Sequence, residues 1–383
     1  MLVSRRSLLA TGLAAAPLMM VPGFALARAE TDKRFVMIIL RGAMDGVNVV
    51  VPVGDPAYAP ARAGLAYQAP PTIGGLFAVH PALVETMRMY DAHEALFVHA
   101  VASPYRDRSH FDGQNILETG GASPYARKDG WLNRLLPLLP GGTRAIAVAS
   151  SVPPILRGHS AVESYAPSGL PEPTDDLLSR VSAMYAPDAE LHPIWDEAMA
   201  ARRLAQASGA DAKGGRDLPR LARLAADFLT KPDGARIAVL ESDGWDTHSG
   251  QQGRLTNQLK QLDTALAALK TGLGPDWANS VVLCATEFGR TVAANGTGGT
   301  DHGTASAAIL AGGALAGGRV IADWPGLAGS ALYEARDLRP TTDLRAVLLA
   351  ASAQHLGVDP ARAARALFAD GPVPRATEGL LRA

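Results

Sequence analysis

The chain has 383 residues and a formal net charge of −1; 48% of the residues are hydrophobic, 19% are charged and one is cysteine. The apolar fraction supports a large core and excludes a disordered chain. The balanced charge excludes a strongly basic nucleic-acid binder. One cysteine excludes an intramolecular disulfide framework and a metal site built from cysteine ligands. Any metal in this protein must therefore be held by histidine, aspartate and glutamate.

Residues 1–29 are predicted to be a twin-arginine export signal. The pair Arg5-Arg6 opens the pattern, an apolar stretch follows to about residue 26, and small residues at A-x-A spacing end at Ala27 or Ala29. A membrane anchor is the alternative, but the Gly- and Ala-rich composition, Pro17 and the cleavage-like end favour a removable signal. We therefore expect a periplasmic or secreted protein that has no membrane association after cleavage.

Residues 30–383 alternate apolar runs with helical patterns, and we expect them to form one α/β domain. Short runs that are apolar on both faces predict the strands of a mostly parallel sheet covered on both sides. In chain order these runs are Phe35–Leu40, Leu96–Val101, Ala145–Ala149, Ile237–Leu240, Val281–Ala285 and Ser306–Ala311, and the apolar pattern also resumes over Val47–Val53.

Helical patterns lie between these runs. A helix is predicted to begin near Ser109, a second covers Gly253–Thr271 with leucines on one face, and a third runs from Asp343 to about His355. The stretch from about 154 to 231 is rich in Ala, Arg, Asp and Pro and is helical in pattern, so it is interpreted as an inserted cap.

Polar side chains gather where the predicted strands end. Because ligands bind beyond the carboxyl ends of parallel strands, we expect these side chains to form one site. Each residue also has an ordinary explanation: a turn, a helix cap, a surface ion pair or a loop decoration. It is much less likely that all five successive strand ends carry such residues for unrelated reasons than that the residues together form a cation site. The connections that carry these residues contain Asp45; Ser109 and His110; Asp243, Asp246 and His248; Glu287 and Arg290; and Asp301 and His302.

A cluster of aspartate, glutamate and histidine without cysteine suits one or two divalent cations. Zinc is the first expectation, and manganese, magnesium and calcium are left open.

The order of these residues resembles the alkaline phosphatase-like superfamily, which includes phosphatases, phosphodiesterases, arylsulfatases and phosphomutases. The motifs MDGVN, RSHFDGQ, GWDTH, TEFGRT and TDHG, met in that order between Arg34 and Gly357, resemble the family of exported bacterial proteins known as domain of unknown function 1501. The resemblance implies a three-layer α/β/α sandwich with a mostly parallel sheet and a helical insertion. It implies no agreed activity for the family.

The superfamily pattern also implies roles for particular residues. Asp45 resembles a carboxylate ligand of one metal, and Ser109 lies where a nucleophilic hydroxyl sits, at a helix start that favours an anion. Asp246 and His248 resemble ligands of a second metal. The remaining ligand positions match Glu287 and His302, with Asp301 beside the latter.

Two departures from that pattern leave alternatives open. The chain has Glu287-Phe288 where superfamily members usually have Asp-His, so one imidazole is missing and His110 is a candidate to replace it. Asp243 is an alternative ligand to Asp246, because the D-x-H spacing is shorter than usual. Cys284 lies inside a predicted buried strand, which disfavours a formylglycine sulfatase.

The resulting expectation is a metal-dependent hydrolase of phosphate esters, or less readily sulfate esters, with Ser109 or water as the nucleophile. Arg108 and Arg290 are candidates to hold the ester oxyanion, although surface positions are the alternative for such arginines. The expected partner is a small-molecule or polymeric ester substrate, and a partner protein is left open. The competing hypothesis is a non-catalytic periplasmic binding or assembly protein that retains a degenerate phosphatase-like site.

Overall fold

The computed structural model describes residues 31–67, 73–166, 174–207 and 217–382, and the predicted export signal lies outside these residues. A nine-stranded sheet forms the centre, in the order β10-β4-β9-β8-β1-β7-β5-β6, with β11 paired to β4. A second sheet pairs β2 (Val50–Val51) with β3 (Ala78–Val79). The strands of the large sheet are β1 (Arg34–Leu40), β4 (Ala95–Ala102), β5 (Ala145–Ala147), β6 (Glu163–Ser164), β7 (Ile237–Ser242), β8 (Ser280–Thr286), β9 (Ser306–Ala311), β10 (Arg319–Ile321) and β11 (Thr342–Asp343).

Strand β9 runs opposite to both of its neighbours. It pairs antiparallel with β4 and β8, whereas the other pairs in the large sheet are parallel. The residues that precede β9 therefore lie at the same edge of the sheet as the residues that follow β1, β7 and β8. This reversal brings a late loop to the edge where the sequence predicts the site.

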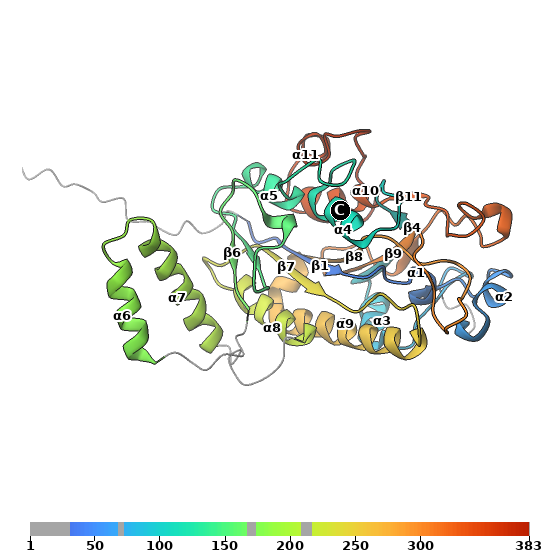
Figure 1. The fold of residues 1–383 in the computed structure, drawn as a ribbon, viewed down its shortest axis with the longest axis horizontal. Helices are drawn as coiled ribbons and strands as arrows, with labels where there is room; N and C mark the ends of the chain where they lie inside the picture. Colours follow the sequence, from blue (N-terminus) through green and yellow to red (C-terminus); the bar gives the residue numbers. More distant parts are fainter. Residues whose placement is uncertain (1–30, 68–72, 167–173, 208–216, 383) are drawn as a thin grey trace, which may run out of the picture.

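Helices cover both faces of the large sheet (Figure 1). Strand β1 shows why, since Val36 and Ile38 belong to one buried cluster while Phe35 and Met37 belong to the other. The predicted three-layer α/β/α fold with a mostly parallel sheet is confirmed. One face packs against α3 (Val84–Asp91), α8 (Leu218–Leu229) and α9 (Gln251–Leu273), and the other against α4 (His110–Thr119), α5 (Trp131–Leu135), α10 (Leu344–Leu349) and α11 (Pro360–Leu367).

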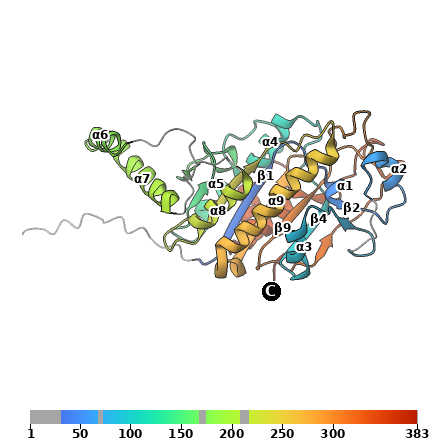
Figure 2. The same cartoon turned by 90° about the horizontal axis from the view of Figure 1, so that it is seen from below.

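Helices α6 (Asp175–Tyr185) and α7 (Leu191–Ala207) form a hairpin that projects from the rest of the molecule, as Figures 1 and 2 show. Both lie within the stretch expected to be an inserted cap. Helix α8 lies in the same stretch, but its leucines pack on the central sheet as part of one helix layer. The projecting part is therefore narrower than residues 154–231.

Two predicted elements differ in detail. The run Val47–Val53 contains a short helix, α1 (Gly46–Val49), followed by β2, so the apolar pattern there is not one strand. The helix predicted from Asp343 is α10, which continues as a π-helical turn over Ala350–Gln354. Within the described part of the chain, no helix combines the length and apolar character that a membrane crossing requires.

Candidate metal centre

Three segments that are distant in sequence meet at the edge of the sheet where β7 and β8 end. His110 is the first residue of α4, and Asp246 and His248 follow β7. Asp301 and His302 lie in the loop before β9. Because β9 is reversed, its preceding loop reaches this edge and completes the cluster.

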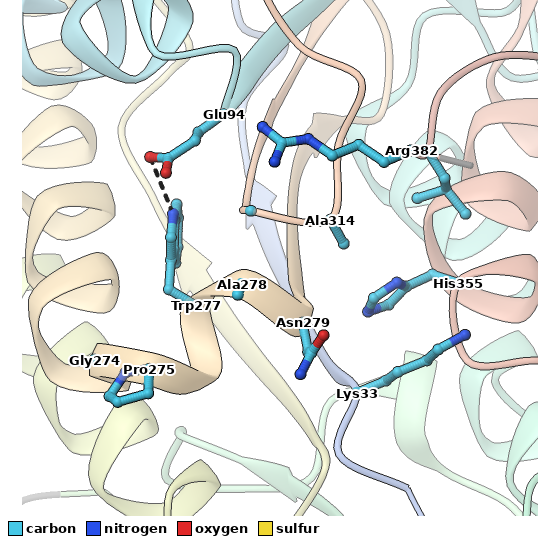
Figure 3. A pocket seen from close by; sticks show the side chains of 12 residues that line it. Lys33, Glu94, Gly274, Pro275, Trp277, Ala278, Asn279, Ala314, His355 and Arg382 are labelled. Atoms are coloured by element: carbon cyan, nitrogen blue, oxygen red, sulfur yellow. Dashed lines mark hydrogen bonds between the residues drawn. The ribbon is translucent and has the colours of Figure 1, made fainter.

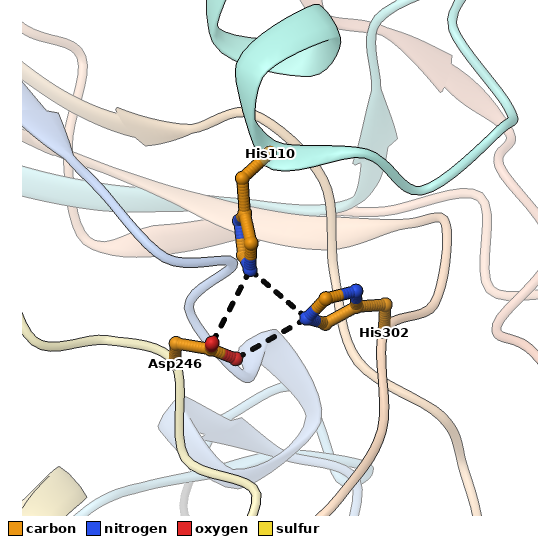
Figure 4. Close-up of side chains that lie close together, drawn as sticks. All are labelled: His110, Asp246 and His302. Carbon is orange, nitrogen blue, oxygen red and sulfur yellow. Dashed lines mark hydrogen bonds and ion pairs between the residues drawn. The ribbon is translucent and has the colours of Figure 1, made fainter.

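The imidazoles and one carboxylate converge on a small volume (Figure 4). The Nε2 atom of His302 lies 2.9 Å from Nε2 of His110 and 3.0 Å from Nε2 of His248. Asp246 Oδ1 is 3.1 Å from His248 Nε2 and 3.3 Å from His302 Nε2, and its Oδ2 is 3.4 Å from His110 Nε2. His110, Asp246 and His302 thus form a group that could hold a metal ion.

The opposite nitrogen of each ring is bound to an oxygen. Nδ1 of His110 lies 2.8 Å from Glu287 Oε1, Nδ1 of His248 lies 3.1 Å from Asp301 Oδ1, and Nδ1 of His302 lies 3.1 Å from the carbonyl of Arg108. Carboxylate and carbonyl oxygens accept hydrogen bonds, so each Nδ1 carries the hydrogen. The Nε2 lone pair of His302 then faces the Nε2 lone pairs of His110 and His248 at hydrogen-bond distance.

A cation fits this donor set better than hydrogen bonds do. Three imidazole lone pairs and an ionised carboxylate attract a positive charge between them, and histidine with aspartate is a typical zinc ligand set. Zinc–nitrogen bonds of about 2.0–2.1 Å in a tetrahedron imply ligand-to-ligand spacings of about 3.3–3.4 Å. The five spacings given above, which do not include the one between His110 and His248, are 2.9–3.4 Å. The residues present therefore fit a divalent ion.

Arg290 supports the carboxylate of this group instead of facing solvent. Its buried guanidinium donates from Nη1 to Asp246 Oδ1 at 2.6 Å and from Nε to Thr300 Oγ1 at 3.2 Å, and it also contacts the Thr300 carbonyl. Partial burial acts to raise the pKa of Asp246, but the hydrogen bond and charge of Arg290 outweigh it and the pKa lies below its usual value. Arg290 therefore keeps Asp246 ionised and in place.

Glu287 lies behind His110. It accepts hydrogen bonds from the Gly42 amide at 2.9 Å, from Thr286 Oγ1 at 2.8 Å and from Gln114 Nε2 at 3.2 Å, besides its contact with His110. Although burial acts to raise the pKa of Glu287, these hydrogen bonds hold it below its usual value. The hydrogen bond that His110 donates to Glu287 raises the pKa of His110, which makes its ring a stronger donor to a cation.

The two histidines that face each other have opposite pKa shifts. The pKa of His302 is lowered first by burial and then by nearby positive charge, which includes the guanidinium of Arg290. On the other side, hydrogen bonds from Asn295 and His248 lower the pKa of Asp301. Asp301 therefore orients His248 as Glu287 orients His110.

Asp45, which the sequence predicts to be a metal ligand, is bound to an arginine in the structure. It is buried at the start of α1, and both of its oxygens are taken by Arg62 at the end of α2 (Tyr58–Arg62): Nη1 lies 2.5 Å from Oδ2 and Nη2 lies 2.9 Å from Oδ1. Gln251 Nε2 also donates to Oδ2 at 2.5 Å. The carboxylate is thus neutralised by an internal guanidinium, and the sequence offered no signal for this partner.

Three other predicted residues take different positions. Asp243 is exposed, and no contact with the cluster is recorded for it among the described residues. Arg108 donates from Nε to Asp337 Oδ2 at 2.8 Å, so its backbone carbonyl, not its guanidinium, supports His302. Ser109 precedes α4, and its hydroxyl makes no recorded hydrogen bond with the cluster among the described residues. The phenol of Tyr105 accepts from the Ser109 amide at 3.1 Å.

A cavity of about 630 Å³ lies at the opposite edge of the sheet, where β1, β4 and β8 begin (Figure 3). The indole of Trp277 donates to Glu94 at 3.2 Å on one side of it, and Lys33, His355 and Arg382 lie on the other. It contains none of the predicted site residues. The cavity is therefore separate from the cluster at the carboxyl edge.

The fold and site define an α/β protein with a histidine- and carboxylate-rich centre at the carboxyl edge of its sheet. The sequence profile of the family described as "Protein of unknown function (DUF1501)" matches residues 93–368, so the chain belongs to that family. No curated protein sequence matches the chain.

Several solved structures are similar to this chain at low identity. An alkaline phosphatase from the Antarctic bacterium TAB5 has 11% identity and a TM-score of 0.38, covering 76% of this chain and 95% of its own. The PsFucS1 sulfatase from Pseudoalteromonas sp. has 13% identity and a TM-score of 0.41, covering 92% and 74%. A phosphonate monoester hydrolase of Agrobacterium radiobacter has 12% identity and a TM-score of 0.36, covering 90% and 79%.

Proposed function

We propose that this protein is an exported, metal-dependent hydrolase of phosphate esters, with sulfate esters as the second substrate class. The observation that supports the proposal most is the convergence of three Nε2 atoms whose Nδ1 partners leave them unprotonated. Such an arrangement has little value in a protein that never binds a cation, because the lone pairs repel one another.

We propose a single divalent ion, zinc first, held by His110, Asp246, His248 and His302. The pairing of Asp45 with Arg62 supports one ion, because a carboxylate with both oxygens on a guanidinium has no free lone pair directed at a cation. When bound, such an ion supplies Lewis-acid polarisation of an ester oxygen and favours ionisation of water at neutral pH.

The residues around the ion have distinct tasks in this proposal. Glu287 and Asp301 orient two imidazoles, and Arg290 positions the carboxylate of Asp246. The side chains of Asp246 and His248 are 42% and 44% exposed, so an ester can approach from solvent. Hydrolysis then forms a bond from a water oxygen to phosphorus and breaks the ester P–O bond, and the organic group leaves as an alcohol with one proton.

We favour water over Ser109 as the nucleophile. The Ser109 amide donates to the phenol of Tyr105 at 3.1 Å, and no contact of the Ser109 hydroxyl with the cluster is recorded among the described residues. A serine nucleophile needs a hydroxyl directed at the cation or at a general base. The Ser109→Ala variant separates the two mechanisms, since a water mechanism keeps most of the activity and a serine mechanism loses it.

Metal content and hydrolysis test the proposal together. We expect purified protein to hold close to one equivalent of metal by elemental analysis and to hydrolyse aryl phosphate esters. His302→Ala should lose both properties, while the exposed His159→Ala, which serves as a matched control, should keep them. Protein that folds normally but holds no divalent metal under any loading condition contradicts the proposal.

The second candidate is a periplasmic binding or assembly protein without turnover. The projecting hairpin favours it, because Leu177, Met184, Leu191 and Ile194 on α6 and α7 are among the exposed large hydrophobic side chains. Such side chains are typical of a surface that meets another protein. Stoichiometric metal without hydrolysis of any phosphate or sulfate ester distinguishes this candidate from the hydrolase.

A further inference from the structure

A hollow of about 400 Å³ lies beside the metal centre, between the segment 291–295 and the segment 327–336. Volumes of this size accept small organic groups. Two of its lining residues, Asp301 and Arg336, also touch the cluster's histidines. The hollow is thus placed to receive part of a molecule that is bound at the centre.

Asp301 links the hollow to the centre, because it lines the hollow and accepts a hydrogen bond from His248. Asp301 accepts from Nδ1 of His248 at 3.1 Å, and its side chain is 52% exposed on the side of the hollow. Arg336 donates from Nη2 to the carbonyl of His302 at 2.8 Å. Both Asp301 and Arg336 thus connect the lining of the hollow to residues that carry the imidazoles of the centre.

The rest of the lining is mostly small and apolar, with Thr291 and Asn295 as its uncharged polar residues. It offers one cation, Arg336, and one anion, Asp301, which leaves no excess positive charge for a polyanionic group such as a nucleoside diphosphate. The aliphatic side chains favour a ring or short alkyl chain that buries apolar surface. These side chains are Ala61, Val292, Ala293, Ala294, Leu327 and Leu332.

We propose that this hollow binds the organic group of the ester, and that the substrate class is esters of a compact, apolar alcohol or phenol. The inference rests on the proposed hydrolase function and adds the part of the substrate that the metal centre does not contact. Arg336 borders both regions, so it positions the junction between the oxyanion and the organic group.

Phosphonates test this inference by binding alone. Phenylphosphonate and methylphosphonate share the anion and differ in the organic group, and neither is cleaved at a P–O ester bond. We expect the zinc-loaded full chain to bind phenylphosphonate about tenfold more tightly in calorimetric titration, as burial of an aromatic ring predicts. Ala293→Phe, which fills the hollow from an exposed position, should abolish that preference and leave methylphosphonate affinity unchanged.

Ala92→Phe provides the matched control, because Ala92 is an exposed alanine at the end of α3 and does not line the hollow. It should bind both phosphonates like the unaltered chain. Equal affinities for the two phosphonates, or a preference that survives Ala293→Phe, overturn the inference while metal binding and ester hydrolysis stand. If zinc-loaded protein binds neither phosphonate and hydrolyses no ester, the proposed function itself fails.

Discussion

Asp45 and Arg62 form a two-pronged ion pair whose side chains are both fully buried. Removing one partner leaves an uncompensated charge in the core, which typically costs about 3–5 kcal/mol of stability. We therefore expect Arg62→Met to lower the free energy of unfolding by about that amount in urea titrations. The double variant Arg62→Met/Asp45→Asn should recover part of the loss. A single variant as stable as the parent protein would contradict the role of the pair.

Glu287 is expected to act on metal affinity through His110. Glu287→Gln keeps an oxygen that accepts from Nδ1 but removes the negative charge that raises the basicity of the ring. Loss of such a partner usually weakens metal binding about 10–100-fold. Competition against a chromophoric chelator measures this change. Glu85→Gln, at an exposed carboxylate on α3, should leave the affinity as it is.

At the scale of elements, the projecting hairpin is separate from the core. None of the described residues of α6 and α7 belongs to the buried clusters that join the sheet to its helices. We therefore expect a chain lacking residues 174–207 to keep its metal and an unfolding midpoint close to that of the full chain. Denaturant unfolding with elemental analysis checks both.

The matched comparison for that deletion is a chain lacking α8, whose leucines fill one face of the sheet. That chain should fail to fold, because several large buried side chains are lost together. If deletion of residues 174–207 alone prevents folding, α6 and α7 are needed for the fold of the central sheet, which contradicts their separation from the core.

The whole molecule is expected to lose stability in acid. Burial lowers the pKa values of His80, His99 and His355 to about 4, against about 6.5 in an unfolded chain. Between these values the unfolded chain binds more protons, so the free energy of unfolding falls as pH decreases from about 6.5 to 4. The contribution is on the order of 1–3 kcal/mol for each buried ring.

Urea unfolding of chelator-treated protein at pH 7.5 and pH 5 measures this loss without a contribution from metal release. A free energy of unfolding that is constant over that interval is inconsistent with buried neutral histidines. Replacement of His99 by Gln removes the titration of this ring and should reduce the pH dependence. The Gln amide then has to take over the ring's hydrogen bonds with the Val50 carbonyl and the Ala100 amide.

The sequence predicted the strands well because runs such as Phe35–Leu40 and Ser306–Ala311 are apolar on both faces. It did not predict that β9 is reversed, since an apolar run carries no information about direction. It placed Glu287 at the site but not behind His110, because that distinction depends on side-chain orientation. The pairing of Asp45 with Arg62 depends on the path of α2, which local patterns do not determine.

The separation of the metal-facing residues along the chain has a consequence for folding. His110 and His302 are 192 residues apart, and the chain has one cysteine, so no disulfide within it can join distant segments. A metal held by both residues acts as the cross-link instead. For a loop of about a hundred residues or more, closure entropy alone makes such a link equivalent to roughly 4–5 kcal/mol. In the proposed exported form of the protein, an ion that is loaded before translocation would thus lock the folded chain for its passage across the membrane.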